Sequence, residues 1–402
     1  MAGALEGLKV VELGEMVSAP YAAKLMADAG AEVIKIERPQ IGDRARTRGP
    51  FPADSPHPEK SGLFLYLNTN KLGVTLDVTR PEGFAVLEKL AATADVLVHN
   101  VAPPEMDRIG LSYDRLRRLN SKLVMTSILP FGLSGPYRDY QAEDLTIWCA
   151  GGVCVLNGGG PEHPELPPLK TFGQQAGYQG GVHGATATMG AVIAALRDGV
   201  GQHVDVSVQE SIASILEMTF EFWPYLGAIA TRVGQKPIQP LETLEAKDGY
   251  IYVCCVEEHQ WRNFVHMMDD PEWADWEIFA NRLTRAANWD ALKPMLQEYV
   301  GQHTVLELYQ TAQSRRVPFA PVSTMADLLG SEHLKARGFF VEIAQPVAGT
   351  HKYPGAPVKY SRTPWEIRRP APTLGQHNQE IFGNRLGLSA ERLTELSRKG
   401  VI

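Results

Sequence analysis

The chain has 402 residues, of which 44% are hydrophobic and 21% are charged, as in ordinary globular proteins. This length exceeds that of one compact core and predicts two or three domains. The net charge of −7, with basic residues dispersed along the chain, argues against a nucleic-acid partner. No basic leader segment opens the chain, and no apolar run approaches the ~20 residues that span a bilayer. We expect a cytoplasmic protein with no membrane partner.

Cysteine and histidine residues give no pattern of a metal site. The cysteines are Cys149, Cys154, Cys254 and Cys255; they lack C-x-x-C spacing, and the vicinal pair is poorly placed for an ordinary disulfide. We expect reduced, mostly buried thiols. The eleven histidines lack metal-ligand spacing, so no metal is expected.

The first third of the chain alternates between strand and helix patterns. Residues 8–13 and 32–37 read as strands, and residues 22–29 between them are rich in helix formers. A helical pattern at 82–91 and short apolar strands at 95–98 and 122–127 continue this alternation. The pattern predicts an α/β fold with a parallel, Rossmann-like sheet.

The loops that follow these strands are the expected ligand-binding region. Residues 14–20 form the first crossover and lack the G-x-G-x-x-G fingerprint, which makes a nicotinamide cofactor improbable. A ligand is still expected at the carboxyl ends of the strands. Arg38 follows the second strand, and three more arginines lie within 42–50. Guanidinium groups suit phosphate, although any one of these arginines equally suits a solvated surface loop.

Asp144 stands where a loop meets a helix. The turn Ser134-Gly135-Pro136 precedes a polar run, and an apolar segment follows Asp144. Aspartate at this position is a favoured N-cap, which is the simpler interpretation. The positive end of the helix dipole also keeps a carboxylate ionised and nucleophilic, so both roles stay open here.

The later part of the chain predicts a second, smaller domain. Small residues dominate 176–196 and indicate a closely packed helix, and residues 202–208 alternate as a strand. We expect a large domain from 1–210 and 340–402, a small α+β domain at 236–325, and linkers at 211–235 and 326–339. The tail would pack back on the large domain, which makes the small domain an insertion.

With these landmarks in order, the chain resembles the class III CoA-transferases, which include formyl-CoA transferase, carnitine CoA-transferase and α-methylacyl-CoA racemase. Eight segments match in the family's order. They are residues 8–13, 31–39 with Gly42-Asp43, Asn70-Lys71, Asn100 with 107–110, Phe131-Gly132 with 135–137, Asp144-Leu145, 201–207 and 336–340.

The resemblance implies a Rossmann-like large domain built from both chain ends, a small inserted α+β domain, and an interlocked dimer. The partner subunit would be a second copy or a paralogous chain. Asp144 becomes the expected nucleophile, which would carry CoA through an aspartyl anhydride and an aspartyl-CoA thioester. The substrates would be an acyl-CoA donor, by default succinyl-CoA, and an organic carboxylic acid, with no permanently bound cofactor.

The resemblance also implies which residues bind CoA. The matching positions are Met16, Val17, Arg38, Asn100, Arg108 and Phe131, with Lys71 as a further candidate. Arg38 and Arg108 would meet phosphates. Backbone N–H groups would stabilise oxyanions, with Gly151, Gly152 and 158–160 as candidates.

Two alternatives stay open. The racemase branch has a histidine where this chain has Glu143, and the loss of the imidazole argues for transfer. A CoA-binding subunit without catalysis is the other alternative, against which the retained Asp144 counts. The glycine-rich loop of formyl-CoA transferase has no match at 240–244, so oxalate and formate are poor substrate guesses.

Overall fold

The structure is a computed structural model that describes residues 3–160, 163–233, 236 and 238–402. It divides into two compact units. The large unit comprises Met1–Gly158, Leu166–Arg232 and Gly338–Ile402, and the small unit comprises Gly159–Glu165 and Val233–Arg337. The expected linker at 326–339 contains two helices assigned mainly to the small unit, and residues 234–235 of the other expected linker lie outside the described residues.

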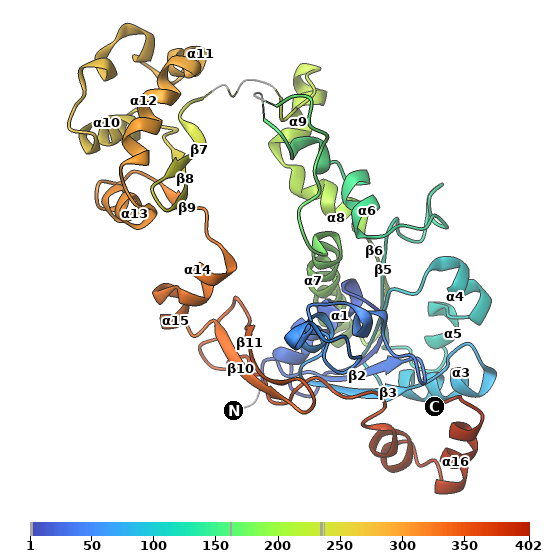
Figure 1. Ribbon diagram of the computed structural model, residues 1–402. Helices are drawn as coiled ribbons and strands as arrows, with labels where there is room; N and C mark the ends of the chain where they lie inside the picture. The colour runs from blue at the N-terminus through green and yellow to red at the C-terminus, as the bar shows by residue number, and fades with distance from the viewer. Residues whose placement is uncertain (1–2, 161–162, 234–235, 237) are drawn as a thin grey trace. The chain divides into compact units, whose positions relative to one another are not determined.

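A parallel six-stranded sheet forms the centre of the large unit, so the α/β prediction is confirmed (Figure 1). Its strands are β1 (Lys9–Leu13), β2 (Glu32–Glu37), β3 (Lys71–Thr75), β4 (Val96–His99), β5 (Val124–Leu129) and β6 (His203–Ser207). The spatial order is β3-β2-β1-β4-β5-β6, the order of a doubly wound sheet. Most strand residues are buried, because helices cover both faces of the sheet.

Two apolar cores cover the two faces of the sheet in the large unit. One core joins α1 and α7 to the sheet, and the other joins α3, α4, α5 and α16 to its opposite face. The helices are α1 (Ser18–Asp28), α2 (Gly62–Leu67), α3 (Pro81–Ala91), α4 (Pro103–Ile109), α5 (Tyr113–Leu116), α6 (Asp144–Ala150), α7 (Gln175–Asp198), α8 (Val208–Ala213), α9 (Met218–Leu226) and α16 (Ala390–Arg398).

The small residues of α7 allow it to pack closely within its own chain. A Cβ at Gly181 would lie 2.9 Å from the Ser18 carbonyl oxygen, and one at Gly184 would lie 2.4 Å from Ile128. Larger residues at either position would push α7 away from α1 and β5. This close packing places the first turn of α7 beside the first crossover.

The C-terminal segment completes the edge of the sheet. It contains a hairpin of β10 (Phe340–Gln345) and β11 (Gly349–Pro354), a π-helix at Gln379–Arg385 and then α16. Beyond the hairpin, the Gly73 N–H donates to His377 Nδ1 at 3.0 Å, and the Thr75 N–H donates to Asn378 Oδ1 at 2.8 Å. The edge strand β3 is thus paired by side chains of the tail.

The small unit has its own sheet and core. Its strands are β7 (Leu241–Ala246), β8 (Gly249–Cys254) and β9 (Ala320–Pro321), and its helices are α10 (Glu258–Met267), α11 (Arg282–Ala287), α12 (Trp289–Gly301), α13 (Val305–Ser314), α14 (Met325–Gly330) and α15 (Glu332–Ala336). Strand β9 has only two residues, and Pro318 just before it cannot donate to a ladder. Helices α10, α12 and α13 cover β7 and β8 with one apolar core. Nowhere in the described ranges is a helix long and apolar enough to cross a membrane.

Candidate active site

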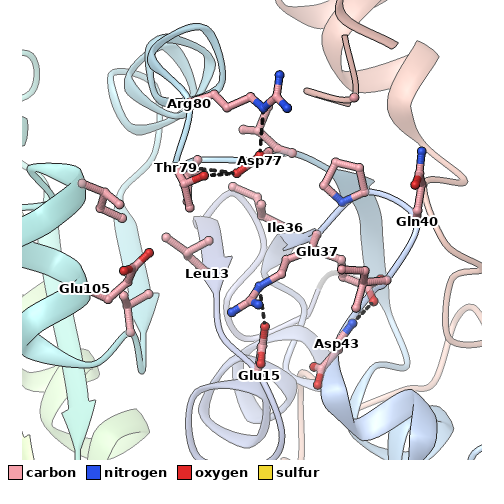
Figure 2. A pocket seen from close by; sticks show the side chains of 18 of the residues that line it. Leu13, Glu15, Ile36, Glu37, Gln40, Asp43, Asp77, Thr79, Arg80 and Glu105 are labelled. Carbon is pink, nitrogen blue, oxygen red and sulfur yellow. Dashed lines mark hydrogen bonds and ion pairs between the residues drawn. The ribbon is translucent and has the colours of Figure 1, made fainter. Parts of the chain in front are cut away.

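A pocket of about 1100 Å³ opens at the carboxyl ends of β1 to β4, where the sheet order reverses between β1 and β4. Figure 2 shows Glu15 after β1, Glu37 at the end of β2, Asp43 in the loop that follows, and Asp77 and Arg80 after β3 around this pocket. This is the place at which open α/β sheets bind their ligands.

Several arginines line the pocket, and three of them are paired with carboxylates. Arg38 and Arg44 lie 3.2 and 3.0 Å from the Glu15 carboxylate, and Arg108 bonds to Glu105 at 2.6 Å. These three arginine side chains are more than half exposed, so an incoming phosphate can reach them without a change of the fold. Arg38 and Arg108, the two arginines expected to meet phosphates, therefore line one pocket.

The first crossover is held by side chains from other loops. Asn100 accepts from the Glu15 N–H at 3.0 Å and donates to the Glu15 carbonyl at 2.8 Å. Met16 has a φ of +62° and donates its N–H to Asp43 Oδ1 at 2.9 Å. Val17, like Met16, is buried. Asn100 lines the pocket, and its amide fixes the crossover that carries Met16 and Val17.

Lys71 does not line the pocket. Its fully buried ammonium is 2.7 Å from Glu12 Oε2 and donates to the Asn68 side chain at 2.9 Å. Lys35 bonds to Glu12 and Asp43, both at 2.8 Å, and these charged groups form a cluster behind the pocket. Burial lowers the pKa of Lys71 to about 8, despite the Glu12 carboxylate. The structure thus gives Lys71 internal partners rather than a surface that faces CoA.

Asp144 is the first residue of α6, and the capping role falls to its neighbours. Glu143 is the N-cap residue, and its N–H donates to the Thr146 hydroxyl at 2.9 Å. The Asp144 carboxylate instead accepts from the Gly177 N–H at 3.0 Å through Oδ1. Its Oδ2 lies 2.8 Å from the Lys170 ammonium, and the two side chains are only 8% and 16% exposed. The capping interpretation is therefore wrong, and the carboxylate is left with a backbone donor and a cation.

Gly177 and Lys170 were not predicted from the sequence as residues of the site. Gly177 is in the first turn of α7, where a Cβ would lie 2.8 Å from that of Val17. Only glycine fits so close to Val17. The Gly177 N–H, which donates to Asp144, therefore lies against the first crossover. A glycine-rich helix start was the available signal for Gly177, whereas Lys170 stands in an irregular loop without any distinguishing pattern.

Two contacts connect the chain segment before Asp144 to the rest of the site. Arg44 also reaches Glu143 at 3.3 Å, which connects the pocket rim to the start of α6. Phe131 follows β5 and meets Tyr137 edge-on, with ring centroids 5.7 Å apart. Phe131 does not line the pocket but supports the loop that leads to Asp144.

The cysteines near the site differ from the expectation. Cys149, in α6, is exposed and Cys154 is buried, with their sulfur atoms 2.9 Å apart. In the small unit, Cys255 is buried and Cys254 is partly exposed, so half of the four thiols are buried. Within the described ranges, no group of three metal-ligating side chains is assembled, and the absence of a metal stays a prediction.

These features define an α/β protein with a ligand pocket at the sheet's switch point and a shielded carboxylate near its rim. The sequence model of CoA-transferase family III matches residues 5–378. The chain is 29% identical to succinate–glutarate CoA-transferase of Agrobacterium fabrum over 94% of both chains. It is 32% identical to the succinyl-CoA:(R)-benzylsuccinate CoA-transferase subunit BbsE of Thauera aromatica, covering 98% of this chain and 97% of that one.

A solved structure agrees with these sequence matches. A CAIB/BAIF family protein from Brucella suis superposes with a TM-score of 0.84 at 30% identity, covering 96% of this chain and 100% of the other. The chain belongs to CoA-transferase family III, as its sequence motifs predicted, and the family supports CoA transfer in general.

Proposed function

We propose that this chain transfers CoA from an acyl-CoA donor, by default succinyl-CoA, to an organic carboxylic acid, with Asp144 as the nucleophile. The observation that carries the proposal is the Asp144 carboxylate, which is free of a capping role and faces the Gly177 N–H and the Lys170 ammonium. The backbone donor and the cation hold this carboxylate in one position, and a positioned carboxylate is suited to nucleophilic attack.

The reaction proceeds in two similar halves. Asp144 attacks the thioester carbonyl of the donor; a C–O bond forms, the C–S bond breaks, and CoA leaves as a thiolate. The thiolate attacks the Asp144 carbonyl of the resulting anhydride, which gives an aspartyl-CoA thioester and releases the donor acid. The acceptor carboxylate then attacks this thioester, and the returning thiolate yields the new acyl-CoA and free Asp144.

CoA would lie in the pocket at the carboxyl ends of β1 to β4. Arg38 and Arg108 would exchange their carboxylate partners for phosphates, because guanidinium groups bind both through paired N–H donors. The relatives' names give succinyl-CoA as the substrate of the Thauera aromatica enzyme, which supports it as the default donor. Met16 and Val17 would border the thioester end, since the first crossover contacts α7 beside Asp144.

The racemase alternative is disfavoured by the residue before Asp144. Glu143 has a side chain that is 70% exposed and pairs with Arg44. Its carboxylate thus pairs with an arginine of the rim, whereas the racemase branch has a histidine at this position. A transferase accordingly fits Glu143 better, as a capping and rim residue.

We also propose that the chain works as a dimer, interlocked with a second copy or a paralogous subunit. Helix α9 supports this, because none of its residues is buried and Trp223 and Tyr225 are 63% and 80% exposed. Contiguous apolar surface of this kind marks interaction sites. Light scattering of the protein expressed alone gives twice the chain mass for a homodimer, and a monomer would instead require a second subunit for activity.

The test of the mechanism is trapping of the acylated enzyme. The protein is incubated with succinyl-CoA and hydroxylamine, with or without a panel of carboxylic acids, and its peptides are mapped by mass spectrometry. We expect a hydroxamate at Asp144 only when acyl-CoA is present, and none in Asp144→Ala. Absence of trapping with every acyl-CoA, together with α-proton exchange in deuterated water, would move the protein to the racemase branch.

A further inference from the structure

Lys170 is held in place by contacts that do not depend on Asp144. It lies in the loop before α7, where its ammonium donates to the Thr171 carbonyl at 2.9 Å and to the Gly173 carbonyl. The same ammonium lies 2.8 Å from Asp144 Oδ2 and forms an ion pair with it, without the geometry of a hydrogen bond. The cation would therefore stay at its position if Asp144 lost its charge.

The proposed reaction removes the negative charge of Asp144, an inference that rests on the proposed function. An aspartyl anhydride or thioester is neutral, and Lys170 then stands 16% exposed without its counter-ion. A largely buried cation that has lost its counter-ion is strongly unfavourable. Among the ion pairs of the described residues, Asp144 is the one carboxylate assigned to Lys170.

The Cys154 thiol, which interacts electrostatically with the ammonium, does not replace the lost carboxylate. Burial and the contact with Cys149 raise the pKa of the Cys154 thiol to about 11, so it stays protonated near neutral pH. An anion from outside the protein can then take the place of the carboxylate.

We propose that Lys170 is the carboxylate-binding site of this enzyme, open to organic acids only while Asp144 is acylated. The donor acid is released from the anhydride at this cation, and the acceptor carboxylate takes its place. It then attacks the Asp144 thioester carbonyl: a C–O bond forms, the C–S bond breaks and CoA thiolate leaves. When the thiolate attacks the acceptor acyl carbon, the Asp144–acyl bond breaks and the regenerated carboxylate returns to Lys170.

The arrangement makes free Asp144 a built-in competitor of the acid substrate. In the resting enzyme the carboxylate of Asp144 occupies Lys170, which prevents an organic acid from binding before CoA is loaded. The order of substrates follows from this single ion pair, because acid binding requires prior neutralisation of Asp144.

The first test uses Asp144→Asn, which is neutral and of nearly the same shape. Binding of succinate is measured by calorimetry without any CoA compound. We expect Asp144→Asn to bind succinate at least about tenfold more tightly than the wild type, the scale of one charge-assisted hydrogen bond. The double variant Asp144→Asn/Lys170→Met should lose this gain, and Asp144→Asn/Lys122→Met, which alters an exposed lysine elsewhere, should keep it. Equal binding by Asp144→Asn and the wild type would overturn the proposal.

The second test follows the acid-dependent half of the reaction. The aspartyl-CoA form is made from succinyl-CoA, and its discharge by ¹³C-labelled succinate is followed by intact-protein mass spectrometry. Lys170→Met should raise the succinate concentration for half-maximal discharge by about 10- to 100-fold, with partial rescue by Lys170→Arg. Unchanged succinate dependence combined with slower loading would mean that Lys170 only positions Asp144. If Lys170→Met does not fold, Lys170→Gln, which keeps donors for the two carbonyls, replaces it.

The two proposals fail in different ways. If the wild type forms no adduct at Asp144, the covalent transfer mechanism is wrong, whereas the calorimetric comparison still measures the anion site at Lys170. If the adduct forms but Lys170→Met discharges like the wild type, only the carboxylate site is wrong.

Discussion

Two groups of shielded charges in the large unit differ in how completely they are paired. In the cluster behind the pocket, Lys35 contacts both Glu12 and Asp43, and Glu12 contacts both Lys35 and Lys71, all of them with fully buried side chains. Near the pocket rim, Asp144 has one cation, and both members of this pair keep some exposure. Shared partners hold the first group in one state, whereas a single partner lets the second change its charge during a reaction.

The largest effect should come from the singly paired group. Asp144→Asn is expected to lower turnover by about 10⁴-fold or more, because Asp144 is the side chain that forms the covalent intermediates in the proposed mechanism. Urea unfolding should show a much smaller change in stability than a substitution in the buried cluster does. Asp144→Ala is the control for deamidation of the asparagine back to aspartate. Substantial turnover by Asp144→Ala would assign the covalent chemistry to another group.

The buried cluster should respond in stability. Lys35→Met leaves Glu12 and Asp43 without their shared cation, and we expect the free energy of unfolding to fall by about 3–5 kcal/mol. Lys335→Met, in an exposed ion pair with Glu332, is the matched control and should change little. Urea titration of both variants measures the difference. Equal stability of the two variants would show that the cluster is dispensable for folding.

A third buried group, His99, is neutral in the folded protein, and its titration should make the stability of the protein depend on pH. His99 ends β4 with Ser127 Oγ 2.7 Å from its Nε2, and burial, assisted by His203, lowers its pKa to about 3. Between pH 6.5 and 3 the unfolded chain binds a proton here that the folded chain does not. Stability should therefore fall as the pH falls through this window, by about 1.4 kcal/mol per pH unit from this group.

The comparison variant for this titration is His99→Gln. Its unfolding free energy, measured by urea titration from pH 7 to pH 4.5, should fall less steeply than that of the wild type. The exposed His57→Gln should keep the wild-type slope. Parallel curves for His99→Gln and the wild type would show that His99 is protonated in the folded state.

The smallest effect is expected at the exposed arginines of the pocket. Arg108→Gln removes one contact that water and salt already weaken, so the KM for acyl-CoA should rise by roughly tenfold at most, with little change in kcat. Arg117→Gln, whose side chain is equally exposed but lies outside the pocket lining, is the control. A fall in kcat with an unchanged KM would mean that Arg108 acts on the reaction rather than on binding. The effect should shrink at high salt.

The sequence predicted the parallel sheet and the position of its pocket because strand and loop patterns are local. Arg38, Asn100 and Arg108 follow from the rule that loops after parallel strands meet at one edge. Lys71 could not be assigned in this way, since its burial depends on Glu12 of another strand and thus on the pairing of β1, β2 and β3. The Gly177 donor is 33 residues from Asp144, and no local pattern encodes that contact.

The tail that pairs the edge of the sheet has a consequence for synthesis of the protein. Asp77 donates its N–H to the Val401 carbonyl at 2.8 Å, so the loop after β3 is bonded to almost the last residue of the chain. A growing chain emerges N-terminus first, and its domains generally fold as units. In this chain the whole small unit is translated before the tail can cover β3. Until then the N–H groups of Gly73 and Thr75 in β3 lack the side-chain acceptors that the tail supplies.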